Sequence, residues 1–368
     1  MELILHIGTE KTGTTSVQNF FRTNREKLAK RGVLYPVAPG QRNHTALAAA
    51  AQEISKRDPL RKTAGLKTDE QVRKFRGKLL ADLERETKAK PFKLAVMSNE
   101  HCSSRLLEDG EVQWLHDKLA KLFSKTRIVV YLRRQDDYLL STYSTSVKSG
   151  GTQPLALPTE RKVQQRYDHW DMLSRWARIF GRENVVARRF EKTALKNGDI
   201  VDDLLEAAGI ELAPAYEKPQ NVNESLDGQS LEFLRLFNKF VPRFAEGDLN
   251  PVRGNIADTL SRFSDGPLLT LPERELAEFQ ASFADSNAKV AAEYFGGARP
   301  GSDDPLFERR SDNRARVHHA PLTVERAVEL GALLWQEKQA QVNRLAQKLK
   351  DGRAELKQTR RKPRSEDA

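Results

Sequence analysis

The N-terminal stretch MELILHIGTEKTGTTSVQNFF most constrains what this chain can fold into. The apolar run from Leu3 to Ile7 is long enough for a buried strand and far too short to span a membrane. A loop between Gly8 and Gly13 follows, and the apolar spacing after it predicts a helix from about Thr14 to Lys30. A strand, a glycine loop and a helix in this order aim backbone N–H groups and a helix N-terminus at a phosphate.

The loop itself carries the residue types that hold a phosphate. The candidate binding residues are Gly8, Thr9, Lys11, Thr12, Gly13, Thr14, Thr15 and Ser16. The two glycines are spaced as in an ATP- or GTP-binding P-loop, but Lys11 precedes the second glycine instead of following it. We therefore expect Lys11 beside the bridge between a nucleotide's 5′-phosphate and the group it carries. The alternative is a hydroxyl-rich turn that only caps a helix.

Charge and composition limit the remaining choices. The 368 residues carry a formal charge of +11, which calls for a negatively charged partner or substrate. Much of the excess lies in the last twenty residues or so, and we find no zinc-finger or other nucleic-acid-binding motif, so no specific nucleic acid is expected. The start of the chain reads as a strand and not as a secretory leader, and the single Cys102 suits a reducing compartment. We expect a cytoplasmic protein.

Strands alternate with helical segments along the first two thirds of the chain. The apolar runs at 92–97, 127–132 and 184–190 predict three further strands, and a charged amphipathic helix is expected over 69–88. This alternation is typical of an α/β fold with a parallel sheet covered on both faces. In such sheets ligands bind beyond the carboxyl ends of the strands, so Glu100 and His101 are expected on the same edge as the Lys11 loop. Glu100 has an alternative role as the cap of the following helix.

We expect the chain to divide into one large domain and an appendage. The α/β domain should cover residues 1–310, with acceptor-specific insertions at about 40–90, 150–165 and 242–270. A helical segment is expected over 311–350, followed by a basic, disordered tail over 351–368. The tail offers a peripheral contact with the inner face of a membrane.

Two motifs resemble those of sulfotransferases that use 3′-phosphoadenosine 5′-phosphosulfate (PAPS). The order Lys-Thr-Gly-Thr-Thr at 11–15 is similar to the family's 5′-phosphosulfate loop, usually Lys-Ser-Gly-Thr-Thr. After the strand at 127–132, Arg133 and Ser141 match the arginine and the serine eight residues later that hold the 3′-phosphate in that family. Arg134 fits this spacing less well and has the alternative of an ion pair with an aspartate. The chain looks most like the bacterial members that act on carbohydrate or other cell-envelope acceptors.

The resemblance implies a P-loop NTPase-like three-layer fold and transfer of a sulfuryl group from PAPS to a hydroxyl, without a metal. It implies that Lys11 stabilises the leaving phosphate oxygen, and that Glu100, His101 or His44 accepts the hydroxyl proton. The chain departs from the family in two respects. The C-terminal Arg-Lys-Gly loop of the cytosolic enzymes is not visible, and the histidine that activates the acceptor has no unambiguous equivalent. Some carbohydrate sulfotransferases use a glutamate, which favours Glu100.

Two other functions fit parts of the sequence. A P-loop kinase or NTPase would need a lysine after Gly13, where the chain has Thr14. A non-catalytic nucleotide- or anion-binding protein would use the basic tail to attach to a membrane or to nucleic acid. For an enzyme, the expected acceptor is a glycan or a glycolipid. The sequence does not indicate an oligomeric state.

Overall fold

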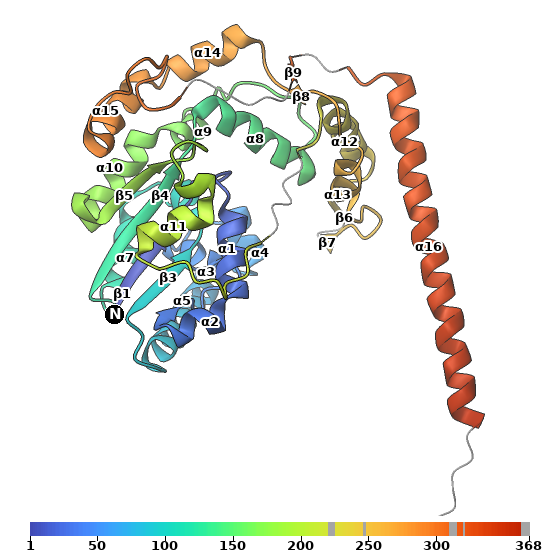
Figure 1. The fold of residues 1–368 in the computed structure, drawn as a ribbon, viewed down its shortest axis with the longest axis horizontal. Helices are drawn as coiled ribbons and strands as arrows, with labels where there is room; N and C mark the ends of the chain where they lie inside the picture. Colours follow the sequence, from blue (N-terminus) through green and yellow to red (C-terminus); the bar gives the residue numbers. More distant parts are fainter. Residues whose placement is uncertain (220–224, 246–247, 309–314, 319–320, 362–368) are drawn as a thin grey trace, which may run out of the picture. The chain divides into compact units, whose positions relative to one another are not determined.

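The computed structural model of the chain describes residues 1–219, 225–245, 248–308, 315–318 and 321–361 (Figure 1). Its residues fall into two compact units. Unit 1 comprises Met1–Thr142, Ala156–Val222 and Glu273–Asp312, and unit 2 comprises Tyr143–Leu155, Asn223–Pro272 and Asn313–Ala368. The second unit thus gathers three separate stretches of sequence, whereas the sequence alone suggests one long domain followed by an appendage.

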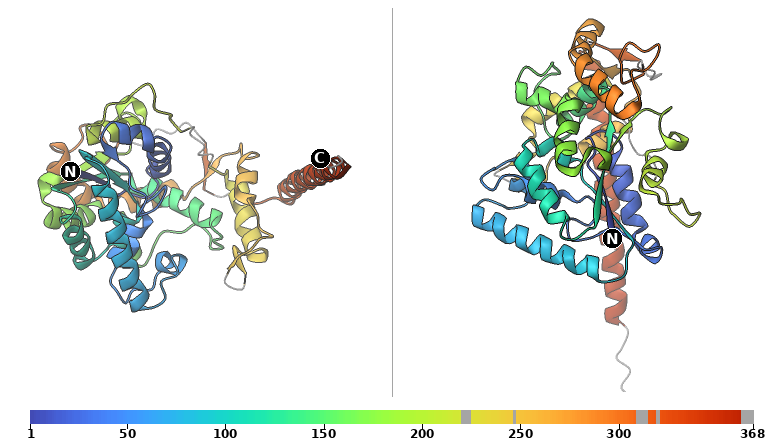
Figure 2. Two further views of the ribbon diagram at one scale, coloured as in Figure 1. Left: turned by 90° about the horizontal axis from the view of Figure 1, so that it is seen from below. Right: turned by 90° about the vertical axis from the view of Figure 1, so that its left-hand side faces the viewer.

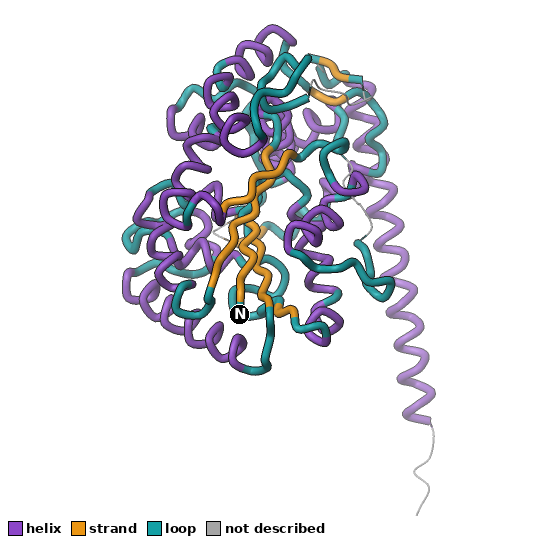
Figure 3. The backbone as a smooth tube through the Cα atoms, turned by 60° about the vertical axis from the view of Figure 1, so that its left-hand side comes forward, coloured by secondary structure: helices purple, strands orange, loops and turns teal. Residues whose placement is uncertain are grey.

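Unit 1 is built on a five-stranded sheet in which every neighbouring pair of strands is parallel. The strands are β1 (Glu2–His6), β2 (Val33–Leu34), β3 (Leu94–Ser98), β4 (Lys125–Leu132) and β5 (Val185–Arg189), in the order β2-β3-β1-β4-β5. They run side by side in Figure 3, where they are orange. β1 is the central strand, and His6 at its end is in register with Ser98 of β3 and Val129 of β4.

Helices cover both faces of this sheet (Figure 2). Along β1, Leu3 and Leu5 point to one face and Ile4 to the other, as the two-residue period of a strand requires. The face of Ile4 packs against α1 (Thr14–Thr23), α2 (Arg25–Lys30) and α11 (Ile200–Ala208). The face of Leu3 packs against α3 (Thr45–Ala51), α5 (Asp69–Lys88), α7 (Asp109–Leu119), α10 (His169–Phe180) and α15 (Ala284–Phe295). The other helices that begin in unit 1 are α4 (Pro59–Thr63), α6 (His101–Arg105), α8 (Gln135–Lys148), α9 (Arg161–Gln164) and α14 (Glu273–Ala281).

The predicted helix over 14–30 is interrupted at Asn24. The Asn24 side chain donates to the carbonyls of Phe20 and Glu217, and its Oδ1 accepts from the Glu217 N–H at 2.9 Å. These bonds tie the fully buried Asn24 to a segment almost two hundred residues away. The apolar residues keep their helical spacing across Asn24. The spacing therefore predicts one continuous helix where the structure has two, α1 and α2.

Unit 2 contains short elements around one long helix. Its elements are α12 (Gly228–Phe240), β6 (Phe244–Ala245), β7 (Asp248–Leu249), α13 (Ile256–Ser261), β8 (Leu268–Leu269), β9 (Arg316–Val317) and α16 (Val324–Arg361). Leu330 and Leu334 of α16 pack with Leu231 and Leu260 of α12 and α13. The helix passes residue 351, where a disordered tail is expected, and ends at Arg361; the rest of the expected tail lies outside the described residues.

The predicted fold class is confirmed: unit 1 has a central parallel sheet between two helical layers, and the chain carries a helical extension near its C-terminus. Within the described ranges, no helix combines the length and the apolar character that crossing a membrane requires. Because the strands are parallel, the loops after β1, β3 and β4 all emerge at one edge, and that edge positions the candidate site.

Candidate active site

The loop after β1 is clamped by backbone bonds that extend the sheet beyond the strand. The N–H groups of Ile7 and Thr9 donate to the carbonyls of Val129 and Tyr131, and Tyr131 donates back to Gly8. The Thr9 hydroxyl reaches the same Tyr131 carbonyl at 3.0 Å. The loop therefore begins as an ordered continuation of β1 and not as a free turn.

The chain then turns sharply into α1. Lys11 has a φ of 66° and Gly13 a φ of 74°, both in the left-handed region. The Thr12 hydroxyl donates to the Thr9 carbonyl at 2.7 Å and closes the turn. Gly13 is the N-cap of α1 and has no side chain to occupy the first-turn amides. Those amides and the positive end of the helix dipole suit a phosphate.

Glu10 anchors the loop to α6, a contact that the sequence analysis missed. One Glu10 oxygen accepts from Ser104 Oγ at 2.7 Å and lies 3.3 Å from Nδ1 of His101. Burial would raise the pKa of Glu10, but the bonds from His101 and Ser104 and the positive charge of Arg166 lower it to about 2. Glu10 is therefore an anion at neutral pH. His101, which precedes Ser104 on α6, is thus a partner of Glu10.

Arg133 and Arg134 follow β4 and have different surroundings. Arg133 donates to the Lys11 carbonyl at 2.6 Å, so it lies against the loop. Arg134 is paired with Asp136 at 3.2 Å and with Asp303 at 3.3 Å, the alternative that the sequence offered for it. Ser141 lies two turns into α8, partly buried. Of the two arginines, only Arg133 is joined to the candidate phosphate loop by a bond that defines its position.

Glu100 is held by α1. Its Oε2 accepts from Nε2 of Gln18 at 2.7 Å, and the same amide lies 3.4 Å from the Ser98 hydroxyl. Glu100 occupies the N-cap position of α6, the alternative that the sequence offered, but its side chain makes no capping bond there. Gly8 also lies close, since a Cβ placed on it would come 3.0 Å from the Glu100 Cβ. The carboxylate is thus fixed next to the start of the loop.

The structure places His44 inside the protein. Its Nδ1 accepts from the Ser98 N–H at 3.0 Å and its Nε2 lies 3.0 Å from the Pro36 carbonyl. Burial lowers the pKa of His44 to about 3, so it is neutral at physiological pH. Both ring nitrogens have backbone partners, and the ring joins the loop before α3 to the end of β3.

Gln18 and Glu10 are the site residues that sequence reasoning missed. Gln18 is almost fully buried on the same side of α1 as its apolar residues. A glutamine among the apolar residues of a helix, one turn after Thr14, is a signal that the sequence does offer, because a buried polar side chain needs a partner. Glu10 gives no such signal, because its partners follow a different strand. Among the described residues, no group of three or more His, Cys, Asp or Glu side chains is placed to hold a metal ion.

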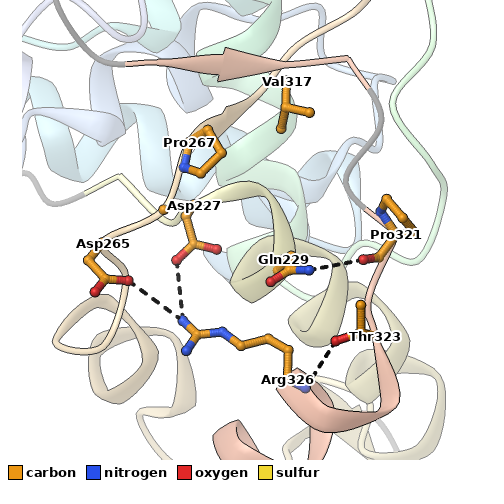
Figure 4. A pocket seen from close by; sticks show the side chains of 9 residues that line it. Asp227, Gln229, Asp265, Pro267, Val317, Pro321, Thr323 and Arg326 are labelled. Atoms are coloured by element: carbon orange, nitrogen blue, oxygen red, sulfur yellow. Dashed lines mark hydrogen bonds and ion pairs between the residues drawn. The ribbon is translucent and has the colours of Figure 1, made fainter.

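Unit 2 has a separate pocket of about 480 Å³ (Figure 4). Arg326 of α16 reaches toward Asp227 at 3.7 Å and Asp265 at 3.9 Å, and Gln229 donates to the Pro321 carbonyl. Asp227 already caps α12 through Ser230. Arg326, the arginine that lines the pocket, lies near two carboxylates. We therefore interpret these contacts as stabilising the packing of α12 against the start of α16.

Comparison with known proteins finds only limited similarity to this chain. No protein-family model matches the chain. An uncharacterized protein of Archaeoglobus fulgidus is 30% identical over 214 residues, which are 55% of each chain. The chain therefore spans about half the length of this curated relative.

The solved structures that resemble the chain include two sulfotransferases. The sulfotransferase from Alicyclobacillus acidocaldarius is 14% identical, covers 78% of this chain and 94% of its own, and has a TM-score of 0.41. The sulfotransferase domain from the curacin biosynthetic pathway is 14% identical, covers 77% and 97%, and has a TM-score of 0.31. At these values the likeness carries no argument about what this chain binds or converts.

Two glycines in unit 1 allow the turn into α1 to be tested. Gly13 and Gly209 have nearly the same φ, 74° and 69°, but a Cβ on Gly13 would come 3.0 Å from Ile200 whereas one on Gly209 would meet nothing within 4 Å. Gly209→Ala should cost about 1–2 kcal/mol from backbone strain alone. Gly13→Ala should cost about 1 kcal/mol more because it also crowds α11. Urea unfolding would compare them; equal losses would contradict the packing of the loop against α11.

Proposed function

We propose that the chain is a sulfotransferase that moves a sulfuryl group from PAPS to an acceptor hydroxyl. The observation that carries the proposal is the position of Lys11. Lys11 has a left-handed backbone conformation two residues before Gly13, the glycine that opens α1, and its carbonyl is bonded to Arg133. A P-loop NTPase places its lysine after that glycine, at the β- and γ-phosphates. Here the lysine would contact the oxygen that links the single 5′-phosphate of PAPS to its sulfuryl group.

Arg133 and Ser141 would select the adenosine 3′-phosphate. A guanidinium can donate two parallel bonds to a phosphate, and a hydroxyl adds a third. Arg133 lies at the carboxyl end of β4, next to the strand that carries the Lys11 loop, and its bond to Lys11 joins the two candidate phosphate sites. Arg134 is a poorer candidate because Asp136 and Asp303 already neutralise it.

The reaction would proceed by in-line displacement. The acceptor oxygen forms a bond to sulfur while the bond between sulfur and the 5′-phosphate oxygen breaks, and the electron pair stays on that oxygen. Lys11 and the first-turn amides of α1 stabilise the developing charge, so catalysis is mainly positioning and electrostatics. No metal takes part in this scheme. The acceptor proton passes to Glu100, because Gln18 holds its carboxylate beside the loop, whereas His44 is buried and His101 is paired with Glu10.

The acceptor is proposed as a glycan or a glycolipid, in line with the resemblance of the two motifs to bacterial carbohydrate sulfotransferases. A cytoplasmic enzyme with a peripheral contact at the inner face of the membrane would meet such acceptors during their synthesis. This part of the proposal rests on the sequence and not on the geometry of the site.

Calorimetric titration with 3′-phosphoadenosine 5′-phosphate, the expected product, would test the choice of co-substrate. The protein should bind it more tightly than ADP, without magnesium. Arg133→Ala should lower that preference about 10- to 100-fold, the worth of a charge-assisted contact. Arg134→Ala, the adjacent control, should keep it. Equal binding of the bisphosphate and ADP, or binding of ATP only with magnesium, would overturn the proposal in favour of an NTPase.

Release of 3′-phosphoadenosine 5′-phosphate from PAPS, measured with a panel of sugar and phenol acceptors, would test the base. Glu100→Gln should slow the release by at least about 100-fold, because the glutamine cannot accept the proton. Bisphosphate binding should be retained in that variant. His101→Asn is the control and should change the rate only a few-fold. A large loss in His101→Asn with little change in Glu100→Gln would show that the histidine is the base.

A further inference from the structure

The later turns of α16 carry an apolar stripe that no described residue of unit 2 covers. Four of its residues, hereafter the α16 stripe, are largely exposed: Trp335 at 71%, Val342 at 57%, Leu345 at 62% and Leu349 at 65%. By contrast Leu330, five residues before Trp335, is fully buried. The first turns of the helix thus pack within unit 2, and Glu337 still lies 3.3 Å from Arg262, which follows α13. The later part of α16 continues past α12 and α13 (Figure 1).

The acidic side chains of α16 lie on the side of the helix away from this stripe. At about 100° per residue, Arg353 lies about 20° and Lys350 about 80° from the line through Val342. Asp351 and Glu337 lie about 180° and 140° away, on the opposite side of the helix. On that far side Glu337 lies 3.3 Å from Arg262 and 3.5 Å from Arg344. The stripe is therefore bordered by cations, and the acids that could neutralise them face away.

We propose that this face of α16 lies on an anionic lipid bilayer, with the stripe in the interfacial region and Lys350 and Arg353 at the headgroups. Exposed tryptophan and aliphatic side chains beside Lys and Arg are the features of helices that lie in the plane of a membrane surface. Long basic side chains can keep their charges at the headgroups while their stems contact the acyl chains. This inference does not depend on the proposed sulfotransferase activity.

A second copy of the chain fits the same face less well. Val328, Trp335, Val342 and Leu349 recur every seven residues, as in one seam position of a coiled coil. The companion seam position is occupied by Gly331, Lys338, Leu345 and Gly352, so only Leu345 supplies a side chain that packs well. In a parallel pair Lys348 would also face Arg353 of the other helix. A lipid surface needs no interlocking side chains and attracts these cations.

Vesicle sedimentation with the full chain tests the proposal, using phosphatidylcholine alone and phosphatidylcholine mixed with phosphatidylglycerol. The protein should bind the anionic vesicles, and Leu345→Ser with Leu349→Ser should weaken binding at least about tenfold. Ala340→Ser with Gln347→Ser introduces the same residue type on the opposite face and should leave binding unchanged. Circular dichroism should show that both double variants keep their helix content.

Tryptophan fluorescence adds a second readout. Anionic vesicles should shift the emission of Trp335 to the blue, and the shift should disappear in Trp335→Phe. Three results would overturn the proposal. Equal vesicle binding by both double variants would leave only a general attraction between basic residues and anionic lipid, and no binding by the unaltered protein would exclude the membrane contact. A dimer in sedimentation equilibrium that is lost in Leu345→Ser with Leu349→Ser would assign the stripe to a second copy of the chain.

Discussion

The candidate site depends on β1 being hydrogen-bonded on both sides. Its residues pair with β3 and β4, and the pairing continues into the loop through Ile7 and Thr9. A central strand cannot change register without disrupting two ladders, so the backbone fixes the loop relative to the ends of both neighbours. The side chains then add contacts between the same elements, from Glu10 to α6 and from Arg133 to the Lys11 carbonyl.

The helix α1 connects the two parts of the proposed chemistry. Its first turn offers amides to a phosphate, and one turn later Gln18 holds Glu100. A single rigid element therefore sets the distance between the group that would bind the leaving phosphate and the group that would accept a proton. Such positioning is the main contribution that a protein makes to an in-line transfer. The packing of α1 against β3 and α11 supports it, and Gly13 allows the close approach to Ile200.

The strands and the loop could be predicted from sequence because each depends on local pattern. Apolar runs gave β3, β4 and β5 to within a few residues, and the helix over 69–88 has the predicted bounds. Contacts between distant segments could not be predicted. Nothing near Asn24 in the sequence indicates its bonds to Glu217, and nothing near His101 indicates that Glu10 is its partner. The same applies to unit 2, whose three stretches come together through packing that no periodicity reveals.

A crystal structure of the protein with 3′-phosphoadenosine 5′-phosphate would test the central claim most directly. The account predicts that the 5′-phosphate lies at the first-turn amides of α1 with the Lys11 ammonium beside it, and that the 3′-phosphate contacts Arg133 and Ser141. Density for the nucleotide in the opposite orientation, or at a place away from the carboxyl ends of β1 and β4, would contradict the account.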